Sequence, residues 1–140
     1  MHYWLVKSDP GDYSWDEFLR EQITNWDGVR NYQARNYLKE MQKGDRVLFY
    51  ESVRDRKIVG IAEVTKAAFP DPTANDNSDG TWVAVELAIL KSLPRAVTLS
   101  QIKNDEILKD VALVKQSRLS VMPFSEKEFN QVIELSKNNG

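Results

Sequence analysis

The sequence is most distinctive at Trp26-Asp27-Gly28-Val29-Arg30-Asn31-Tyr32-Gln33-Ala34-Arg35-Asn36. This stretch combines two aromatic rings, two arginines, two asparagines and a glutamine. A buried helix would be more apolar, and a solvated helix would carry more lysine and glutamate. The mixture is typical of a pocket for a flat polar ring, because aromatic faces stack on the ring, amides bond its edge and arginines hold nearby phosphates.

The residues that follow this stretch predict a helix and two strands. The helix is expected over residues 31–41, and Lys43-Gly44-Asp45 ends it. Apolar and β-branched residues fill segments 46–51 and 58–64, so each segment predicts a strand. The charged residues 53–57 form the hairpin loop expected between them.

Further elements are expected on both sides of this region. A β-prone run over residues 3–7 is stopped by turn residues, and a capping box at Ser14-Trp15-Asp16-Glu17 begins a helix that ends near Gln22. The remaining expectations are a polar loop over 69–80, a strand over 82–90, a helix over 99–104 after Thr98, an ambiguous segment over 111–116, a strand over 119–122 and a helix from Ser125 to about residue 137. Strands with short helices at their ends indicate an α+β domain built on a small, curled, mostly antiparallel sheet.

Length and composition narrow the class of protein. The chain has 140 residues, which predicts a single domain over residues 1–140. It has no cysteine, no signal-peptide pattern and no apolar run near the roughly 20 residues that cross a bilayer. We therefore expect a protein of the cytoplasm, or of the nucleus if it is eukaryotic, that does not engage a membrane. The net charge of −2 excludes a strongly basic coat, so nucleic-acid binding would need a local patch.

The sequence lacks motifs for catalysis or metal binding. The single histidine, His2, stands near the N-terminus, and no hydrolase, P-loop or dinucleotide-binding motif is present. The stretch Asn75-Asp76-Asn77-Ser78-Asp79-Gly80, with Glu86, nearly fits a calcium loop. An EF-hand needs a helix on each side, whereas Pro70-Asp71-Pro72 precedes this stretch and a β-prone run follows it, so a solvated turn is expected. No catalytic residue, metal or cofactor is predicted.

Five basic residues flank turns or strand ends: Lys7, Arg30, Arg35, Lys115 and Arg118. Ordinary surface charge explains any one of them taken alone. Arg30 and Arg118 adjoin small polar residues rather than a charged helix face, so they are the better candidates for binding phosphate.

The tryptophans divide into two groups. Trp4 and Trp82 lie in expected strands, where core positions are favoured. Trp26 lies between Asn25 and Asp27 in an expected loop, where a tryptophan has less reason to be buried. For Trp26 the sequence leaves two roles open, as part of the wall of a pocket or as a residue that fills the core.

The order of several motifs resembles that of the EVE domain family. The resemblance begins at Tyr3-Trp4-Leu5-Val6-Lys7-Ser8-Asp9-Pro10, includes the stretch 26–36, and continues through Gly44-Asp45, Val47-Leu48-Phe49-Tyr50-Glu51-Ser52, Ile58-Val59-Gly60-Ile61-Ala62-Glu63-Val64, Phe69-Pro70-Asp71-Pro72 and Gln116-Ser117-Arg118-Leu119-Ser120-Val121. It covers nearly the whole chain. The family implies a PUA-like β-barrel of about five to six mostly antiparallel strands with short peripheral helices, related to the YTH domains. Its implied function is recognition of a modified base in DNA or RNA, with the base inserted into a pocket.

The resemblance also implies which residues form the site. The residues expected to line the base pocket are Lys7, Ser8, Trp26, Gly28, Val29, Arg30, Asn31, Tyr50, Ser52, Leu119 and Ser120. Those expected to meet phosphate or backbone are Arg30, Arg35, Lys115 and Arg118. Within this set we expect Trp26 to stack on the base, Asn31 and Ser8 to bond its edge, and the arginines to hold phosphate.

Two other functions stay open beside this one. PUA-like domains often accompany RNA-modifying chemistry, so an enzyme acting on nucleic acid or a nucleotide is one alternative, although the sequence offers no nucleophile–base pair. A protein-interaction module is the other, although the sequence offers no clear apolar groove. We expect a monomeric, non-enzymatic binding module whose partner is modified DNA or RNA.

Overall fold

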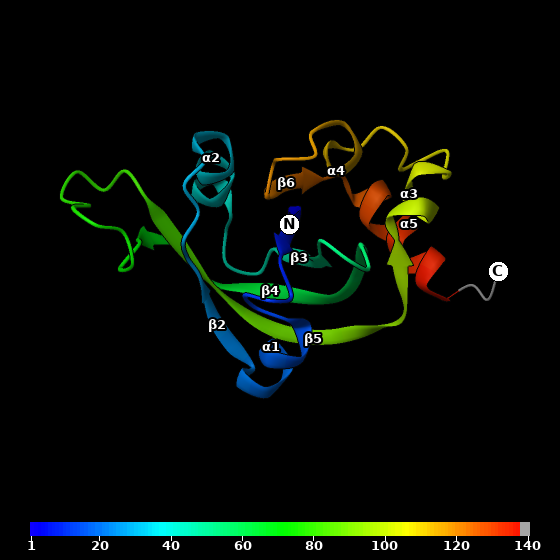
Figure 1. Ribbon diagram of the computed structural model, residues 1–140, viewed down its shortest axis with the longest axis horizontal. Coiled ribbons are helices and arrows are strands. Elements are labelled where there is room, and N and C mark those ends of the chain that lie inside the picture. Colours follow the sequence, from blue (N-terminus) through cyan, green and yellow to red (C-terminus); the bar gives the residue numbers. More distant parts are fainter. Residues whose placement is uncertain (138–140) are drawn as a thin grey trace.

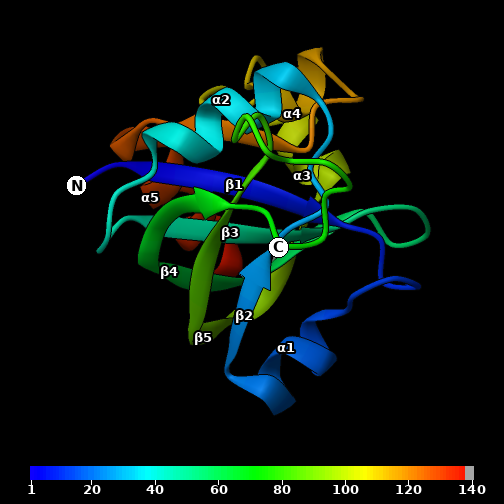
Figure 2. The same ribbon diagram turned by 90° about the vertical axis from the view of Figure 1, so that its left-hand side faces the viewer.

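One six-stranded sheet organises residues 1–137, which the computed structural model describes. The elements in chain order are β1 (Tyr3–Ser8), α1 (Trp15–Glu21), β2 (Ile23–Trp26), α2 (Tyr32–Glu40), β3 (Arg46–Glu51), β4 (Lys57–Pro70), β5 (Val83–Thr98), α3 (Leu99–Lys103), α4 (Ala112–Lys115), β6 (Val121–Phe124) and α5 (Glu126–Lys137). Helices α2 and α4 lie on one side of the curved sheet and α1 lies on the other (Figure 1, Figure 2).

The strands lie in the order β2-β5-β4-β3-β1-β6. β1 and β3 pair in parallel, from Tyr3 opposite Arg46 to Ser8 opposite Glu51, and the other neighbouring pairs are antiparallel. This confirms the α+β class and the mostly antiparallel sheet. The expectation of a closed barrel is wrong, because within residues 1–137 the edge strands β2 and β6 do not pair with each other.

The sheet curls because its two longest strands are bulged. β4 and β5 pair along most of their length, with shifts of register between Ile58/Gly60, Ile61/Ala62, Val64/Lys66 and Lys66/Phe69. Bulges of this kind bend and twist a strand pair without closing the sheet. The far end of this hairpin projects from the sheet as an arm (Figure 1). Both strands are longer than the expected 58–64 and 82–90.

Capping residues begin the helices where the sequence predicted them. Ser14 and Thr98 each form a capping box, and Ser125 bonds reciprocally with Glu128 at the start of α5. The side-chain oxygen of Asn31, Oδ1, accepts from the backbone N–H of Ala34, the third residue of α2. The predicted helices near 14–22, 31–41, 99–104 and 125–137 are thereby confirmed, and the ambiguous segment 111–116 contains the short helix α4.

Strand β2 was missed by the sequence analysis. It is an edge strand that pairs with β5 from Ile23 opposite Ala88 to Trp26 opposite Val85. Its middle residues are polar and Ile23 is exposed, so the segment lacks the alternation that marks a strand. The placement of Trp26 in a loop is therefore wrong, because Trp26 ends this strand.

An aromatic cluster links the core to the end of β2. Trp15 of α1 lies so close to Gly60 of β4 that a Cβ at Gly60 would sit 2.0 Å from its ring, so only glycine fits there. The Trp15 ring packs against Phe18 and Phe49 at centroid distances of 5.5 and 5.1 Å. Phe49 in turn meets Trp26 at 5.6 Å. The core therefore extends without a break to the position of Trp26.

Candidate functional site

A hollow of about 630 Å³ opens where β1 ends beside the loop between β2 and α2. This hollow, here named hollow A, is lined by Lys7, Ser8, Asp9, Asp12, Tyr13, Trp26, Asp27, Gly28, Val29, Arg30, Asn31 and Ser120. The structure thus brings together all the residues expected in the base pocket except Tyr50, Ser52 and Leu119.

Trp26 belongs to hollow A and to the core at the same time. Only 9% of its surface is exposed, although it lines the hollow. Its indole meets Phe49 and Tyr13 edge-on, at centroid distances of 5.6 and 6.2 Å. Both roles that the sequence left open therefore apply. The neighbouring rings hold Trp26 rigidly, and a rigid aromatic surface suits a flat ligand.

Two polar side chains in hollow A have already used part of their hydrogen-bonding capacity. The Ser8 hydroxyl donates to the Tyr13 carbonyl, so towards a ligand it can only accept. The Asn31 carbonyl oxygen accepts from Ala34 N at 2.9 Å, which leaves the side-chain amide as a donor. These two groups offer a ligand one acceptor and one donor.

Four residues that line hollow A were not predicted from the sequence, namely Asp9, Asp12, Tyr13 and Asp27. The first three follow β1 directly in a turn, and the fourth lies inside the distinctive stretch itself, so proximity in sequence was the available signal. Burial raises the pKa of Asp27, and the charge of Asp71 raises it further. Hollow A therefore contains carboxylate acceptors beside its aromatic surface.

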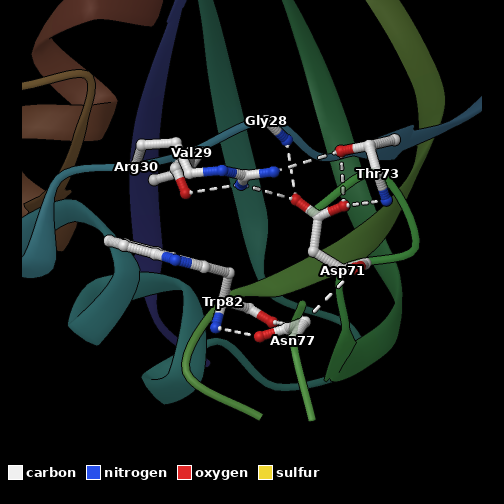
Figure 3. A network of polar contacts seen from close by, with 7 residues as sticks. All are labelled: Gly28, Val29, Arg30, Asp71, Thr73, Asn77 and Trp82. Carbon is white, nitrogen blue, oxygen red and sulfur yellow. Dashed lines mark hydrogen bonds and ion pairs between the residues drawn. The ribbon is translucent and has the colours of Figure 1, made fainter. Parts of the chain in front are cut away.

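The buried carboxylate of Asp71 holds one wall of hollow A in place (Figure 3). Its Oδ2 accepts from Gly28 N at 2.8 Å and from Arg30 Nη1 at 2.9 Å. Its Oδ1 accepts from the backbone N–H and the hydroxyl of Thr73 at 2.7 and 2.6 Å. Burial alone would raise the pKa of Asp71, but the bonds from Thr73, Arg30 and Gly28 lower it to about 2. The ionised side chain therefore joins the β2–α2 loop to the loop after β4.

Asn77 and Trp82 hydrogen-bond to each other in the arm between β4 and β5 (Figure 3). The Asn77 amide donates to Trp82 O at 2.8 Å, and Trp82 N donates back to Asn77 Oδ1 at 3.0 Å. The stretch that resembles a calcium loop is thus a turn flanked by strands, as expected. The expected core position of Trp82 is wrong, because Trp82 precedes β5, is only half-buried and packs on Tyr32 and the Arg30 guanidinium at 5.0 and 5.6 Å.

Two of the arginines expected to bind phosphate are held by the protein itself. Arg30 lines hollow A but is ion-paired with Asp71, and its side chain is 39% exposed. Arg35 donates to Thr81 O at 3.0 Å and lies over the Tyr32 ring at 5.1 Å, outside the lining of hollow A. Both side chains therefore have structural bonds in addition to any role with a ligand.

The other two candidates lie together on a neighbouring rim. Lys115 and Arg118 line a smaller hollow of about 320 Å³ with Leu119, and Asn31 lines both this hollow and hollow A. Lys115 is ion-paired with Asp110 at 3.2 Å, and both side chains are largely exposed. Arg118 is exposed as well. This rim is accessible to a ligand that extends beyond hollow A.

Tyr50 and Ser52 line a second hollow, here named hollow B, rather than hollow A. Hollow B has a volume of about 590 Å³, and its lining is Lys7, Tyr50, Ser52, Val53, Arg56, Leu99, Leu113 and Ser117. Lys7 is common to the two hollows. The set of residues expected around one pocket is therefore divided between adjoining sites.

Within residues 1–137 the structure offers neither a metal-binding cluster nor a membrane-spanning helix. That range holds no group of three or more His, Cys, Asp or Glu side chains that could bind a metal ion. None of its helices combines the length and the apolar character needed to cross a membrane. The one histidine, His2, donates its backbone N–H to Asp45 at the opposite end of β1 from hollow A.

Comparison with known proteins identifies the family to which this curled sheet belongs. The model of the EVE domain matches residues 2–135, so the chain belongs to the EVE domain family, and the resemblance seen in the sequence is confirmed. Thymocyte nuclear protein 1 of Gallus gallus is 32% identical, over 96% of this chain and 69% of its own length.

Two solved structures extend the comparison. The human THYN1 protein, in a crystal structure with 5-methylcytosine-containing DNA, is 28% identical, with a TM-score of 0.92 and coverage of 100% of both chains. The YTH domain of Zygosaccharomyces rouxii MRB1, in complex with N6-methyladenosine RNA, is 14% identical, with a TM-score of 0.61 and coverage of 98% of this chain and 87% of its own. The likeness to the YTH domain concerns the fold alone.

Proposed function

We propose that this chain binds a modified nucleobase in DNA or RNA, and that the base enters hollow A. The composition of hollow A carries the proposal, because the rigid ring of Trp26 lies with an acceptor on Ser8 and a donor on Asn31 in a single hollow. The human relative was crystallised with 5-methylcytosine-containing DNA, which supports a base as the ligand.

The polar groups of hollow A favour a base with an exocyclic amino group. Carboxylates accept hydrogen bonds from such groups, which cytosine and adenine carry. Asp27 and the Ser8 hydroxyl supply acceptors in hollow A, and the Asn31 amide supplies a donor for a ring nitrogen or carbonyl. Val29, 8% exposed, offers an apolar contact for a methyl group on the base.

The backbone of the nucleic acid is held outside hollow A in this proposal. A flipped base costs a few kcal/mol to unstack, and least when it is already single-stranded. Arg118 and Lys115, on the rim shared with Asn31, then contact phosphate without reading sequence. Arg30 acts as a positioning residue, because its ion pair with Asp71 fixes the loop that carries Gly28 and Asn31.

We further propose that the chain binds without catalysing a reaction and acts as a monomer. The hydroxyl of Ser8 donates to a backbone carbonyl rather than to a base, so it is not poised as a nucleophile. The name of the relatives supports a nuclear location in a eukaryote, and a cytoplasmic one is proposed otherwise.

The proposal is tested by titrating the protein with fluorescent oligonucleotides, single-stranded and duplex, DNA and RNA. Each is made with and without one 5-methylcytosine or N6-methyladenine. We expect tighter binding to at least one modified form than to its unmodified match. Equal affinities throughout would contradict the proposal. Mass spectrometry of the oligonucleotides after long incubation supplies the test of catalysis, since a changed mass would favour the enzyme.

A further inference from the structure

Hollow B adjoins hollow A at Lys7. Its volume of about 590 Å³ is close to the 630 Å³ of hollow A. Lys7 lines both hollows, and its ammonium donates to Ser117 O at 2.7 Å. That bond fixes the end of the lysine side chain at the rim of hollow B, which Ser117 also lines.

Hollow B carries positive charge without compensation. Its lining contains Lys7 and Arg56 and, within residues 1–137, no carboxylate, and neither cation forms an ion pair in that range. Burial lowers the pKa of Lys7, and the charge of Arg56 lowers it further, so the two cations repel each other. An anion bound between them would remove this repulsion and accept hydrogen bonds from both.

The loop that carries Arg56 is attached to the rim of hollow A. The backbone N–H and the hydroxyl of Ser52 both donate to Ser8 O, at 2.9 and 3.2 Å. The next residue, Val53, has a φ of 80°, a left-handed conformation that β-branched residues rarely adopt, and it is 56% exposed. Strained backbone of this kind is found at ligand-binding loops. The two bonds from Ser52 to Ser8 therefore join the lining of hollow B to that of hollow A.

We propose that hollow B binds the phosphodiester and sugar of the nucleotide adjacent to the one whose base enters hollow A. This rests on the proposed function. Lys7 and Arg56 contact the phosphate, and the apolar side chains of Val53, Leu99 and Leu113 contact the sugar and base. Hollow B adds affinity and direction along the strand, while hollow A selects the base.

The test uses Arg56→Gln, with Arg54→Gln as the matched control. Both residues are exposed arginines of one loop, but Arg54 does not line hollow B. The probe is a short single-stranded DNA with one 5-methylcytosine, in which each neighbouring phosphodiester is replaced in turn by a neutral methylphosphonate. Affinity is measured by fluorescence anisotropy, and thermal melts confirm that both variants fold.

We expect Arg56→Gln to weaken binding about fivefold to tenfold and Arg54→Gln by less than about twofold. One neutral linkage beside the modified base should weaken the wild type by a similar factor and should weaken the Arg56→Gln variant less, because only Lys7 then contacts that phosphate. The slope of log Kd against log salt should fall by about 0.7 in Arg56→Gln, as expected for one lost contact to single-stranded phosphate.

The outcomes separate this inference from the proposed function. Equal losses in the two variants, or a linkage effect that is as large in Arg56→Gln as in the wild type, would show that hollow B is not the phosphate site, whatever the base preference. A wild type that ignores the methyl group but keeps the linkage effect would overturn base selection and leave hollow B standing. A wild type that binds no oligonucleotide would overturn both.

Discussion

Asp45 and Asp71 are both 2% exposed, and each carboxylate accepts several hydrogen bonds. Asp45 accepts from Trp4 Nε1 at 3.0 Å and from the backbone N–H groups of Gln42 and His2 at 2.9 and 3.1 Å. It thereby ties the first residues of β1 to the turn before β3. Asp71 instead joins two loops beside hollow A, at the other end of β1.

The difference lies in what surrounds each carboxylate. Around Asp45 the β1–β3 ladder and the core, with Trp4 at 4% exposure, already fix the chain, so Asp45 adds stability. The two loops that Asp71 joins lie beyond the last paired residues of β2 and β4, and Gly28 reaches Asp71 with a φ of 78° that favours glycine. The same chemistry therefore stabilises the sheet at one end of the molecule and shapes a candidate binding surface at the other.

The largest effect on stability is expected from Asp45→Asn. An amide has one acceptor oxygen where the structure uses two, and its NH2 would face N–H groups. The free energy of unfolding, measured with urea, should fall by about 1–3 kcal/mol. Affinity per folded molecule for a modified oligonucleotide should not change. If Asp45→Asn weakened the affinity without lowering the stability, the distinction between the regions around Asp45 and Asp71 would fail.

Asp71→Asn should weaken binding of the oligonucleotide more than it lowers the stability of the fold. The substitution replaces one of the two Asp71 carboxylate oxygens that hold the two loops together. Gly28, Arg30 and Thr73 are exposed and can hydrogen-bond to water instead, so the loss of stability should be smaller than that of Asp45→Asn. The loosened wall of hollow A should weaken binding about tenfold, which corresponds to about 1.4 kcal/mol. Parallel urea and anisotropy measurements on the two variants make the check. Equal affinities in the two variants would mean that Asp71 has no special role at hollow A.

Selectivity is expected to depend on Asn31 more than on Arg118. Asn31→Asp keeps an N-cap for α2, because aspartate caps as well as asparagine, but it removes the amide donor. The ratio of affinities for modified and unmodified base should then fall severalfold, by about the cost of one unpaired group. Arg118→Gln should weaken both forms alike. If Arg118→Gln collapses the ratio and Asn31→Asp preserves it, the two roles have been exchanged.

The smallest expected effect is a loss of affinity at acidic pH. The pKa values of Asp45 and Asp71 are lowered, that of Asp71 to about 2, so their stabilisation is complete above the ordinary value of 3.8 and is lost as the pH falls through the lowered values. The raised pKa of Asp27 means that this group protonates before the other two as the pH falls, at a pH above its ordinary value of 3.8. Affinity should therefore weaken in that window while the fold persists, and Asp27→Asn should remove the dependence. Circular dichroism monitors the fold over the same pH range. Loss of affinity and of the fold at the same pH would contradict this order.

The sequence predicted the helices of this fold better than its strands and its site. Capping residues such as Ser14 and Thr98 mark helix starts locally, whereas β2 is polar and gains its strand conformation only by pairing with β5. The bulges that curl the sheet depend on long-range register, which no local pattern encodes. Eight of the twelve residues that line hollow A were predicted, five of them in the stretch 26–36, but no local pattern shows that Lys7 lines two hollows and that Tyr50 and Ser52 line the second one.

The central claim, that a modified base enters hollow A, is tested most directly by the NMR signals of two indole N–H groups. Trp26 lines hollow A, and Trp4 donates its indole N–H to Asp45 at the other end of β1. Trp26→Phe and Trp4→Phe variants assign the two signals. On titration with 5-methylcytosine single-stranded DNA, the Trp26 signal should shift strongly, because ring currents of a stacked base act at close range, while the Trp4 signal should stay in place. Binding that leaves the Trp26 signal unmoved, or that shifts both signals equally, would contradict the account.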